Sequence, residues 1–444
     1  MSHFLFIASD YKPKPGGIAA YIDNLARGLI QLGNRVRVLA VVPPDDKNRI
    51  KFLEDYEEWV SPFPAVCGER PQNWLGNWCV SLLEILRCRL PSTRHLLERT
   101  PLFRSSSNSI SRFRQILAKE KPDIVIFGHL DLDLYPFALA VLEHRVPFGL
   151  IAHDAEVCRR PSRINDMARR GLMLKEAAWI AANSNHTRGL LEMWRMPSDK
   201  ITIVHPPIAA KAIQESAKSV PRDRRDSYNL ITICRLVDNK GIDIVLRALK
   251  ILDQQGIRCR YVVAGDGVER SRLEMLVDAL GIRDRVQFTG LIADETKWSL
   301  LHDADVFVMP SRVNLQHQHE GFGLAFIEAA AFGVPGVGST GGGIPEAVIH
   351  GETGLLVPEE SPEKLAEALQ FLYDNPEKRK QMGRVGMERA RSQFSPIAIA
   401  AHFQNEVSKR TFKNIETARD REAPRGHERI QGTVRALLGR LSAR

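Results

Sequence analysis

Short apolar runs alternate with longer amphipathic segments along most of the chain. An apolar run at residues 4–8 is followed by a glycine pair, a helical pattern over 18–32 and a second apolar run at 36–42. This order of strand, turn, helix and strand is typical of Rossmann-like parallel sheets covered by helices. Further buried strands are predicted at 123–127, 148–152, 178–183 and 201–204, and in the second half at 230–234, 261–264, 286–290 and 304–309. The pattern therefore predicts an α/β protein.

Candidate chemistry is concentrated in residues 320–356. After Gly321 and Gly323 comes a segment that is apolar except for Glu328, which predicts a buried helix. A buried carboxylate needs hydrogen-bond donors, and a ligand diol would supply them. The glycines let a ligand approach the helix N-terminus, where free N–H groups and the helix dipole favour an anion. Glu320, just before the helix, can accept hydrogen bonds from sugar hydroxyls. The stretch therefore predicts a nucleotide-sugar site.

An alternative interpretation of the same residues needs no ligand. In it, Glu328 is a buried structural acid paired with an arginine, and Glu320 is a solvated loop residue. Both interpretations concern the same stretch, which continues into a second glycine cluster at residues 339–346.

Glu320 and Glu328, with seven residues between them around Gly-Phe-Gly, resemble the Glu-x7-Glu motif of the retaining glycosyltransferases of family 4. The stretches 342–346 and 351–357 fit that family in order and spacing, and the resemblance runs with gaps from Phe4 to about Phe394. It implies the GT-B fold, in which two Rossmann-like parallel-sheet domains face each other across a cleft. We expect an acceptor domain at 1–206, a nucleotide-sugar donor domain at 207–395, a helix crossing back at 396–412 and a basic, flexible tail at 413–444.

The resemblance also implies roles for individual residues, several of which suit the chemistry independently. Arg235 and Lys240 lie on a loop after a predicted strand and can clamp a diphosphate, the arginine as a planar fork and the lysine as a point charge. His153 ends another predicted strand, where α/β folds place their ligands. The predicted catalytic residues are His153, Glu320, Arg235 and Lys240. The predicted donor-binding residues are Gly16, Gly17, Phe322, Gly323, Leu324 and Glu328, with Glu328 on the ribose.

Composition narrows the range of partners. The 444-residue chain has a net charge of +9, which favours anionic partners such as nucleotide phosphates or an anionic membrane surface. The basic residues are not interleaved with aromatic ones, so no nucleic-acid partner is expected. The six cysteines are scattered, as expected for free thiols in a reducing compartment. No run is apolar for long enough to cross a membrane, and the N-terminus is predicted to be a strand rather than a signal peptide.

Five regions admit more than one interpretation. Residues 44–110 contain tryptophans and arginines, either as an insertion with a small core or as an acceptor- or membrane-facing surface. The basic tail is either solvated or binds anionic membrane. Asp131-x-Asp133 and His317-x-His319 have two-residue spacings compatible with a metal, but we expect no metal at either. Gly265-Asp266-Gly267 lacks the third glycine of a dinucleotide-binding motif and is interpreted as a turn.

These observations lead to one expected function and two rivals. We expect a cytoplasmic, metal-independent and cofactor-free retaining glycosyltransferase, free or peripheral on the inner face of the membrane. It would use a nucleotide diphosphate sugar, with UDP or GDP left open, and a glycan, lipid-linked or small-molecule acceptor, in bacterial cell-surface polysaccharide or glycolipid synthesis. The rivals are a nucleotide-sugar epimerase on the same fold and a non-catalytic nucleotide-sugar-binding protein.

Overall fold

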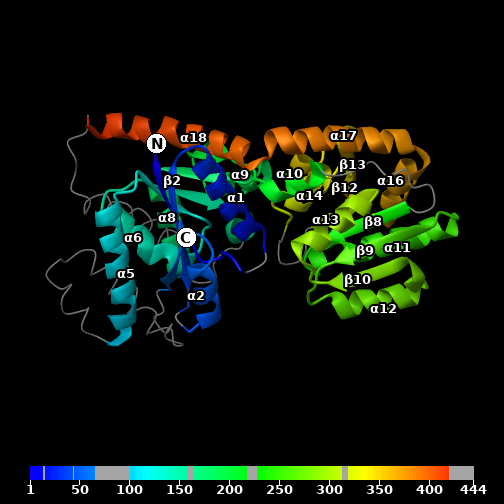
Figure 1. The fold of residues 1–444 in the computed structure, drawn as a ribbon, viewed down its shortest axis with the longest axis horizontal. Coiled ribbons are helices and arrows are strands. Elements are labelled where there is room, and N and C mark those ends of the chain that lie inside the picture. Colours follow the sequence, from blue (N-terminus) through cyan, green and yellow to red (C-terminus); the bar gives the residue numbers. More distant parts are fainter. Residues whose placement is uncertain are drawn as a thin grey trace, which may run out of the picture.

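Two α/β domains lie side by side in the computed structural model (Figure 1). The structure describes residues 1–13, 16–43, 45–65, 101–158, 164–217, 228–312 and 319–419. Several predictions lie outside these ranges: those for Trp74, Trp78 and their neighbouring arginines, for His317, and for the tail beyond residue 419.

The N-terminal domain is built on a seven-stranded parallel sheet with the order β3-β2-β1-β4-β5-β6-β7. Its strands are β1 His3–Ala8, β2 Arg35–Val42, β3 Val60–Pro64, β4 Ile124–Phe127, β5 Phe148–Ala152, β6 Trp179–Ala182 and β7 Ile201–Ile203. Edge strand β3 was not predicted, because its two prolines argue against a strand in the interior of a sheet. The other strands confirm the predicted α/β pattern.

The C-terminal domain is built on a six-stranded parallel sheet with the order β10-β9-β8-β11-β12-β13. Its strands are β8 Tyr228–Ile233, β9 Cys259–Ala264, β10 Val286–Gly290, β11 Val306–Met309, β12 Gly336–Ser339 and β13 Gly354–Val357. The two domains confirm the GT-B arrangement of paired parallel sheets. In each sheet the strand order reverses once, between β1 and β4 and between β8 and β11, and ligands of such sheets bind beyond the strand ends at that point.

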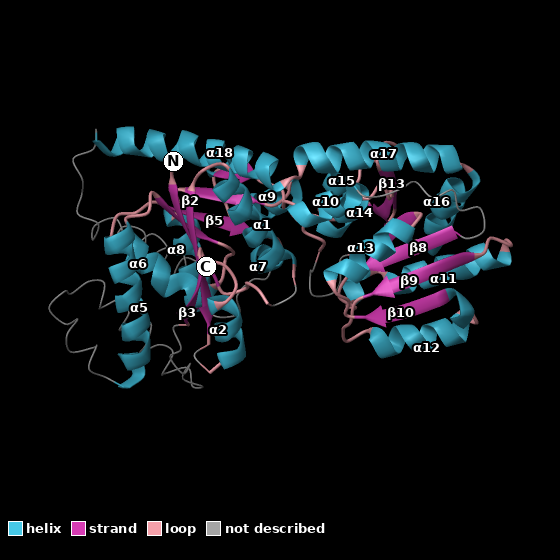
Figure 2. Cartoon of the chain, viewed as in Figure 1, coloured by secondary structure: helices cyan, strands magenta, loops and turns pink. Residues whose placement is uncertain are grey.

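Helices enclose both sheets (Figure 2). The N-terminal domain contains α1 Gly17–Gln31, α2 Lys47–Glu54, α5 Pro101–Glu120, α6 Tyr135–Glu143, α7 Ala155–Cys158, α8 Ile164–Glu176 and α9 Asn185–Met193. The C-terminal half contains α10 Ala210–Ala217, α11 Ile242–Gln254, α12 Arg270–Leu280, α13 Asp294–Asp303, α14 Leu324–Ala331, α15 Ile344–Ala347, α16 Pro362–Asp374, α17 Pro376–Gln393 and α18 Pro396–Arg419. Short 3-10 turns lie at η2 Leu132–Leu134, η3 Ser198–Lys200, η4 Asp238–Lys240 and η5 Arg283–Arg285. None of the helices in the described ranges is long and apolar enough to cross a membrane.

One hydrophobic core continues from the first domain into the second. Alternate residues of each strand face opposite sides of the sheet, so that Phe4 and Phe6 contribute to one core while Leu5 and Ile7 contribute to another. The first of these cores extends through Ile208 and α14 into the C-terminal domain. The two domains are therefore joined by buried apolar side chains as well as by the chain itself.

Helix α18 returns from the second domain to the first, and with α17 it runs along one side of both domains (Figure 1). Its Phe403 is fully buried, and its ring centroid lies 6.0 Å from that of Phe4, 6.3 Å from Phe6 and 5.0 Å from Trp179. Gly28 of α1 lies so close to the carbonyl of Pro396 that a side chain there would collide with it.

In the structure α18 extends to Arg419, beyond the predicted boundary at 412/413 between this helix and the tail. No glycine or proline interrupts residues 397–419, and the next such residue is Pro424. A helix continues until such a residue or a capping signal ends it.

Replacing Phe403 tests whether α18 stabilises the N-terminal domain. We expect Phe403→Ala to lower its free energy of unfolding by about 3–5 kcal/mol, because a fully buried ring is lost. Urea unfolding followed by circular dichroism measures this. The matched control is Phe371→Ala on α16, whose side chain is 37% exposed and should cost only about 1 kcal/mol. Equal losses in the two variants would contradict the role of α18.

Candidate active site

Two loops of the C-terminal domain meet at the point where its strand order reverses. The loop after β8 carries Lys240, and the loop after β11 carries Glu320. Their side chains form an ion pair although 80 residues separate them along the chain. The structure thus brings two of the predicted catalytic residues together, in the place where sheets of this kind bind ligands.

Positive charge dominates this pair of loops. Burial by itself lowers the pKa of Lys240, but the adjacent Glu320 carboxylate raises it above its ordinary value, so Lys240 is charged at neutral pH. Arg235 lies five residues earlier, and its exposed side chain makes no hydrogen bond or ion pair with another described residue. One carboxylate beside two cations leaves a net positive corner that suits a diphosphate.

Arg312 ties the two loops together. Its buried guanidinium donates to the side chain of Asp238 at 2.9 Å and to that of Asp243 at 2.7 Å. It also donates to Glu360 at 2.9 Å. Burial by itself lowers the pKa of Arg312, but these three carboxylates raise it above the ordinary value. Arg312 belongs to the loop after β11 and Asp238 to the loop after β8, so the contact helps to fix the position of Lys240.

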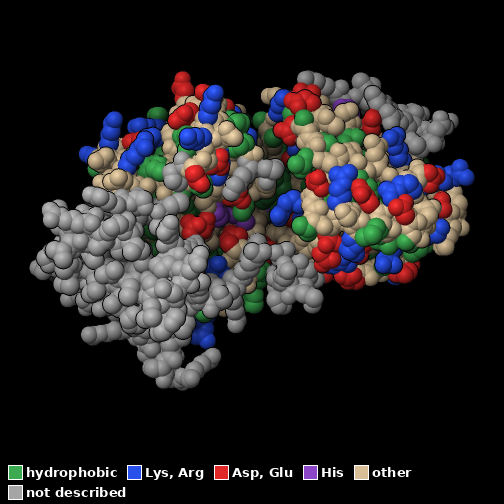
Figure 3. All heavy atoms as spheres, turned by 90° about the horizontal axis from the view of Figure 1, so that it is seen from below, with side chains coloured by type: hydrophobic (Ala, Val, Ile, Leu, Met, Phe, Trp, Pro, Cys, Tyr) green, Lys and Arg blue, Asp and Glu red, His purple; other side chains and the backbone are tan. Residues whose placement is uncertain are grey.

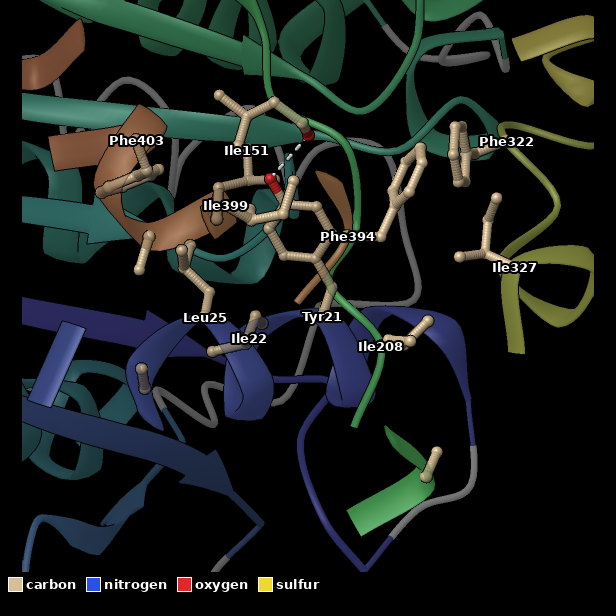
Figure 4. Close-up of a cluster of buried hydrophobic side chains, with 14 of the residues drawn as sticks. Tyr21, Ile22, Leu25, Ile151, Ile208, Phe322, Ile327, Phe394, Ile399 and Phe403 are labelled. Atoms are coloured by element: carbon tan, nitrogen blue, oxygen red, sulfur yellow. Dashed lines mark hydrogen bonds between the residues drawn. The ribbon is translucent and has the colours of Figure 1, made fainter. Parts of the chain in front are cut away.

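The N-terminus of α14 lies beside the Lys240–Glu320 pair. Gly323 has a φ of 94°, a conformation that favours glycine, and the helix begins at the next residue. The Phe322 side chain is buried, with its ring centroid 5.0 Å from that of His205 and 5.6 Å from that of Phe394 (Figure 4). Of the predicted donor-binding residues, Phe322 therefore offers a ligand only its backbone. Its ring packs between the two domains.

Glu328 has a partner within the protein. Lys297 of α13 donates to its Oε1 atom at 3.2 Å and also lies 3.2 Å from Asp294. Burial by itself lowers the pKa of Lys297, but the two carboxylates raise it. An arginine as the partner of a structural Glu328 is thus wrong, because the partner is a lysine. The Glu328 side chain is only partly buried, and this ion pair compensates its charge. Burial therefore does not demand a ligand diol, and the ribose contact stays a prediction.

His153 follows β5 at the edge of the N-terminal sheet that faces the other domain. Its Nε2 atom donates to the carbonyl of Gly128 at 2.8 Å, since a carbonyl can only accept. Its backbone N–H donates to Glu156 at 2.7 Å, and the ring of Tyr21 lies edge-on at 5.1 Å. Burial lowers the pKa of His153, so the imidazole is neutral near pH 7. With Nε2 protonated, Nδ1 can accept a hydrogen bond from a ligand hydroxyl.

Asp131 belongs to a cluster of polar side chains, with Ser9 and His129, that was not predicted from the sequence. Its carboxylate accepts from Ser9 and from the backbone of Asp133 at 3.0 Å, and it lies 3.4 Å from His129 Nε2. Burial by itself raises the pKa of Asp131 and lowers that of His129. These contacts outweigh burial, so the pKa of Asp131 is lowered and that of His129 is raised. Among the described residues, no group of three or more His, Cys, Asp or Glu side chains is arranged to hold a metal. Ser9 follows β1 and His129 follows β4, so only the sheet order places them together.

Gly16 and Gly17 open α1, as the sequence predicts. Apart from the adjacent residues and the backbone of α1 itself, no atom of the described residues lies within 4 Å of the position that a Cβ would take at either glycine. Packing therefore does not require glycine here, and the space leaves the backbone open to a ligand. The preceding loop is anchored by Lys12, which lies 2.9 Å from the buried Asp23 of α1, and Arg27 contacts the same carboxylate at 3.1 Å.

The domains meet at Gly321. A Cβ there would lie 2.5 Å from the carbonyl oxygen of His153 and 3.0 Å from the side-chain amide of Asn183. Asp154, next to His153, has a φ of 101°, which non-glycine residues rarely adopt. This contact, called the domain seam below, places Glu320 of one domain next to His153 of the other. On the face shown in Figure 3, acidic and histidine side chains gather beside the gap between the domains, with basic side chains across it.

Two family models together match most of the chain. The model described as Glycosyltransferase Family 4 matches residues 15–211, and the model described as Glycosyl transferases group 1 matches residues 214–389. The chain belongs to the group 1, family 4 glycosyltransferases. The resemblance carried by the Glu-x7-Glu motif is thus confirmed at the level of the family.

Relatives of this glycosyltransferase include the GDP-mannose-dependent alpha-(1-6)-phosphatidylinositol monomannoside mannosyltransferase of Mycobacterium tuberculosis. It is 26% identical over 411 residues, which cover 90% of this chain and 97% of that protein. The alpha-D-kanosaminyltransferase of Streptomyces kanamyceticus is 32% identical over 164 residues, 36% of this chain and 41% of that protein. The putative colanic acid biosynthesis glycosyltransferase WcaL of Salmonella typhimurium is 35% identical over 140 residues, 32% of this chain and about one third (34%) of that protein.

Solved structures share the fold. HepE of Anabaena, crystallised with UDP and glucose, has a TM-score of 0.66 and 19% identity, covering 92% of this chain and all of that one. The sucrose-phosphate synthase of Thermosynechococcus elongatus has a TM-score of 0.67 and 21% identity, covering 94% of this chain and all of that one. At these identities the likeness concerns the GT-B fold.

The lowered pKa of His153 predicts a pH profile. Because a lowered pKa keeps the imidazole neutral to lower pH, protonation of His153 should slow sugar transfer only below its ordinary value of about 6.5. We expect kcat/KM to be flat from about pH 8 to 6.5 and to fall below that. His153→Gln should lower the rate about tenfold, as expected for the loss of one hydrogen bond. Its kcat/KM should also no longer show the fall at acidic pH, called the acidic limb.

The control for this profile is His144→Gln, at an exposed histidine that follows α6. It should leave the profile unchanged. A wild-type acidic limb centred above pH 6.5, or one that His153→Gln retains, would contradict the assignment.

Proposed function

We propose that this glycosyltransferase transfers a sugar from a nucleotide diphosphate sugar to a hydroxyl of a glycan, lipid-linked or small-molecule acceptor, with retention of anomeric configuration. One observation carries the proposal: the Lys240–Glu320 pair lies where the C-terminal sheet reverses its strand order, and the seam brings it next to His153. A cation for phosphate, a carboxylate for hydroxyls and a neutral histidine are thereby available to one ligand.

The donor is proposed to bind mainly to the C-terminal domain. Arg235, Lys240 and the N-terminus of α14 would hold the diphosphate, and Glu328 the ribose. Gly16 and Gly17 would approach the donor from the other domain, across space that packing leaves open. HepE binds UDP and the mycobacterial relative depends on GDP-mannose, so both bases are candidates here.

The proposed step replaces one bond to the anomeric carbon by another. The bond from that carbon to the diphosphate oxygen breaks, and the acceptor oxygen bonds to the carbon from the same face. The departing phosphate takes the acceptor proton, while Arg235 and Lys240 stabilise its charge. Glu320 binds sugar hydroxyls and is not assigned as a nucleophile, since it is already paired with Lys240. The two cations supply the charge that a metal would otherwise provide, so the proposal includes no metal ion and no cofactor.

The acceptor is proposed to enter from the N-terminal domain, beside His153 and the Ser9–His129–Asp131 cluster. Carboxylates and histidines there suit hydrogen bonds to hydroxyls. A role in bacterial cell-surface polysaccharide or glycolipid synthesis draws support from the printed names of the WcaL and mycobacterial relatives. The net charge of +9 supports peripheral binding to anionic membrane. The epimerase and binding-protein rivals draw no support from these relatives, which carry the names of glycosyltransferases.

Calorimetric titration with UDP, GDP and their sugars, without added metal, tests the donor site. We expect one nucleotide to bind, and Arg235→Ala to weaken it about 10- to 100-fold, because a charged hydrogen bond is lost. The control is Arg258→Ala, an exposed arginine that follows α11 away from the seam, which should bind as wild type does. Binding of no nucleotide, or equal binding by both variants, would refute the proposal.

Glu328 needs a second comparison, because Lys297 is its partner. Glu328→Ala and Lys297→Ala both break the ion pair, whereas only Glu328→Ala removes the proposed ribose contact. If Glu328 binds ribose, only its replacement should strongly weaken nucleotide binding. Equal effects would make Glu328 structural.

A further inference from the structure

We infer that Glu346 is a positioning residue that latches the two domains together in the arrangement that transfer requires. The inference rests on the proposed function, because the arrangement matters only if His153 and the donor loops act on one substrate. Glu346 was not among the predicted site residues. Its partners are about 140 to 160 residues away along the chain.

The carboxylate of Glu346, on α15 of the C-terminal domain, receives four hydrogen bonds, all from across the seam. Its Oε1 atom accepts from the backbone N–H of Asn185 at 2.6 Å and of His186 at 3.4 Å. Its Oε2 atom accepts from the side-chain amide of Asn185 at 2.8 Å and from His205 Nε2 at 3.1 Å. Burial by itself raises the pKa of Glu346, but His205 and Asn185 lower it below the ordinary value, so the latch is ionised at neutral pH.

Glu346 completes the N-terminus of α9. The first N–H groups of a helix have no partner within the helix, and the helix dipole favours a negative charge there. The N-cap residue Ser184 already accepts from Thr187 at 3.1 Å. The backbone N–H groups of Asn185 and His186 have no partner within the helix. The Glu346 carboxylate, from the other domain, accepts a hydrogen bond from each. The N-terminal domain therefore presents a site for one anion, and the C-terminal domain supplies it.

On the donor side, Glu346 is rigidly connected to Glu320. Arg389 of α17 donates to the carbonyls of Glu346 at 2.6 Å and Ala347 at 2.8 Å, which fixes α15. Gly343, at the start of α15, donates to the carbonyl of Glu320 at 2.7 Å. A side chain at Gly343 would collide with the carbonyl of Gly321. The latch and the donor loop therefore move as one unit.

On the acceptor side, the latch partner is connected to His153. Asn183 lies two residues before Asn185, and its amide donates to the carbonyl of His153 at 3.3 Å. That carbonyl is the atom that Gly321 approaches across the seam. The latch thus holds the loop of Glu320 against the turn of His153. Without it, the seam can open, and His153 moves away from a donor that stays on the C-terminal domain.

The test separates donor binding from domain closure. In Glu346→Ala, the dissociation constants of UDP and GDP should stay within about threefold of wild type, because the proposed phosphate and ribose contacts lie in the C-terminal domain. Turnover should fall at least tenfold with little change in the KM for the donor. Small-angle X-ray scattering should show a larger radius of gyration than for wild type, with or without the nucleotide.

Matched variants complete the design. Glu346→Gln keeps an oxygen for the N–H groups of α9 and should recover part of the turnover. Asn185→Ala removes one of the four hydrogen bonds from the other domain, that of the side-chain amide, and should reproduce part of the defect. Glu352→Ala, at an exposed carboxylate in the turn after α15, should behave as wild type does.

Two results would overturn the latch: wild-type turnover and wild-type scattering in Glu346→Ala, or a loss of nucleotide binding as large as the loss of turnover. If wild type binds neither nucleotide and transfers no sugar, the proposed function fails instead. The scattering comparison then still decides whether Glu346 holds the domains together.

Discussion

A backbone contact between the domains determines the geometry of the whole site. At the seam, Gly321 lies against the carbonyl of His153 at a distance that leaves no room for a side chain. This contact brings the Lys240–Glu320 pair, which belongs to one sheet, next to a histidine that belongs to the other. The Lys240–Glu320 pair lies at the strand reversal of its sheet, whereas His153 follows β5, one strand beyond the reversal between β1 and β4. Neither half alone combines the Lys240–Glu320 pair with the neutral imidazole.

The seam has an apolar side and a polar side with different physical properties. On the apolar side, Phe322 and Phe394 pack beside His205, and the core continues from one domain to the other (Figure 4). Buried apolar contacts have no directional preference and tolerate small rotations. On the polar side, the four hydrogen bonds of Glu346 fix one geometry. The apolar contacts keep the domains joined, while the polar ones determine the angle between them.

The sequence predicted what depends on local pattern. The boundaries of β5 agree with the predicted strand at 148–152, since a short apolar run between polar turns is a strong signal. Glycine-rich β12 and edge strand β3 carry no such signal and were missed. Within the candidate site, Arg235, Lys240, Glu320 and His153 could be predicted because each follows a recognisable strand or motif, and their roles stay predictions.

Contacts set by tertiary structure could not be found from one sequence. Lys297 reaches Glu328 because α13 packs beside α14, and Ser9 reaches His129 because β1 lies next to β4. Glu346 stands in a motif that was noticed, but its partner at the start of α9 depends on how the two domains meet. Periodicity and motif spacing contain no information on that angle.

Hydrogen exchange with and without saturating UDP or GDP tests the central claim most directly, namely that the donor binds where the C-terminal sheet reverses its strand order. The account predicts slower exchange in residues 234–241 and 320–328. The alternative anion site in that domain is a hollow at the amino ends of β9 and β10, lined by Arg258, Arg260 and Arg285. Protection confined to that hollow, or no protection at 234–241 and 320–328, would contradict the account.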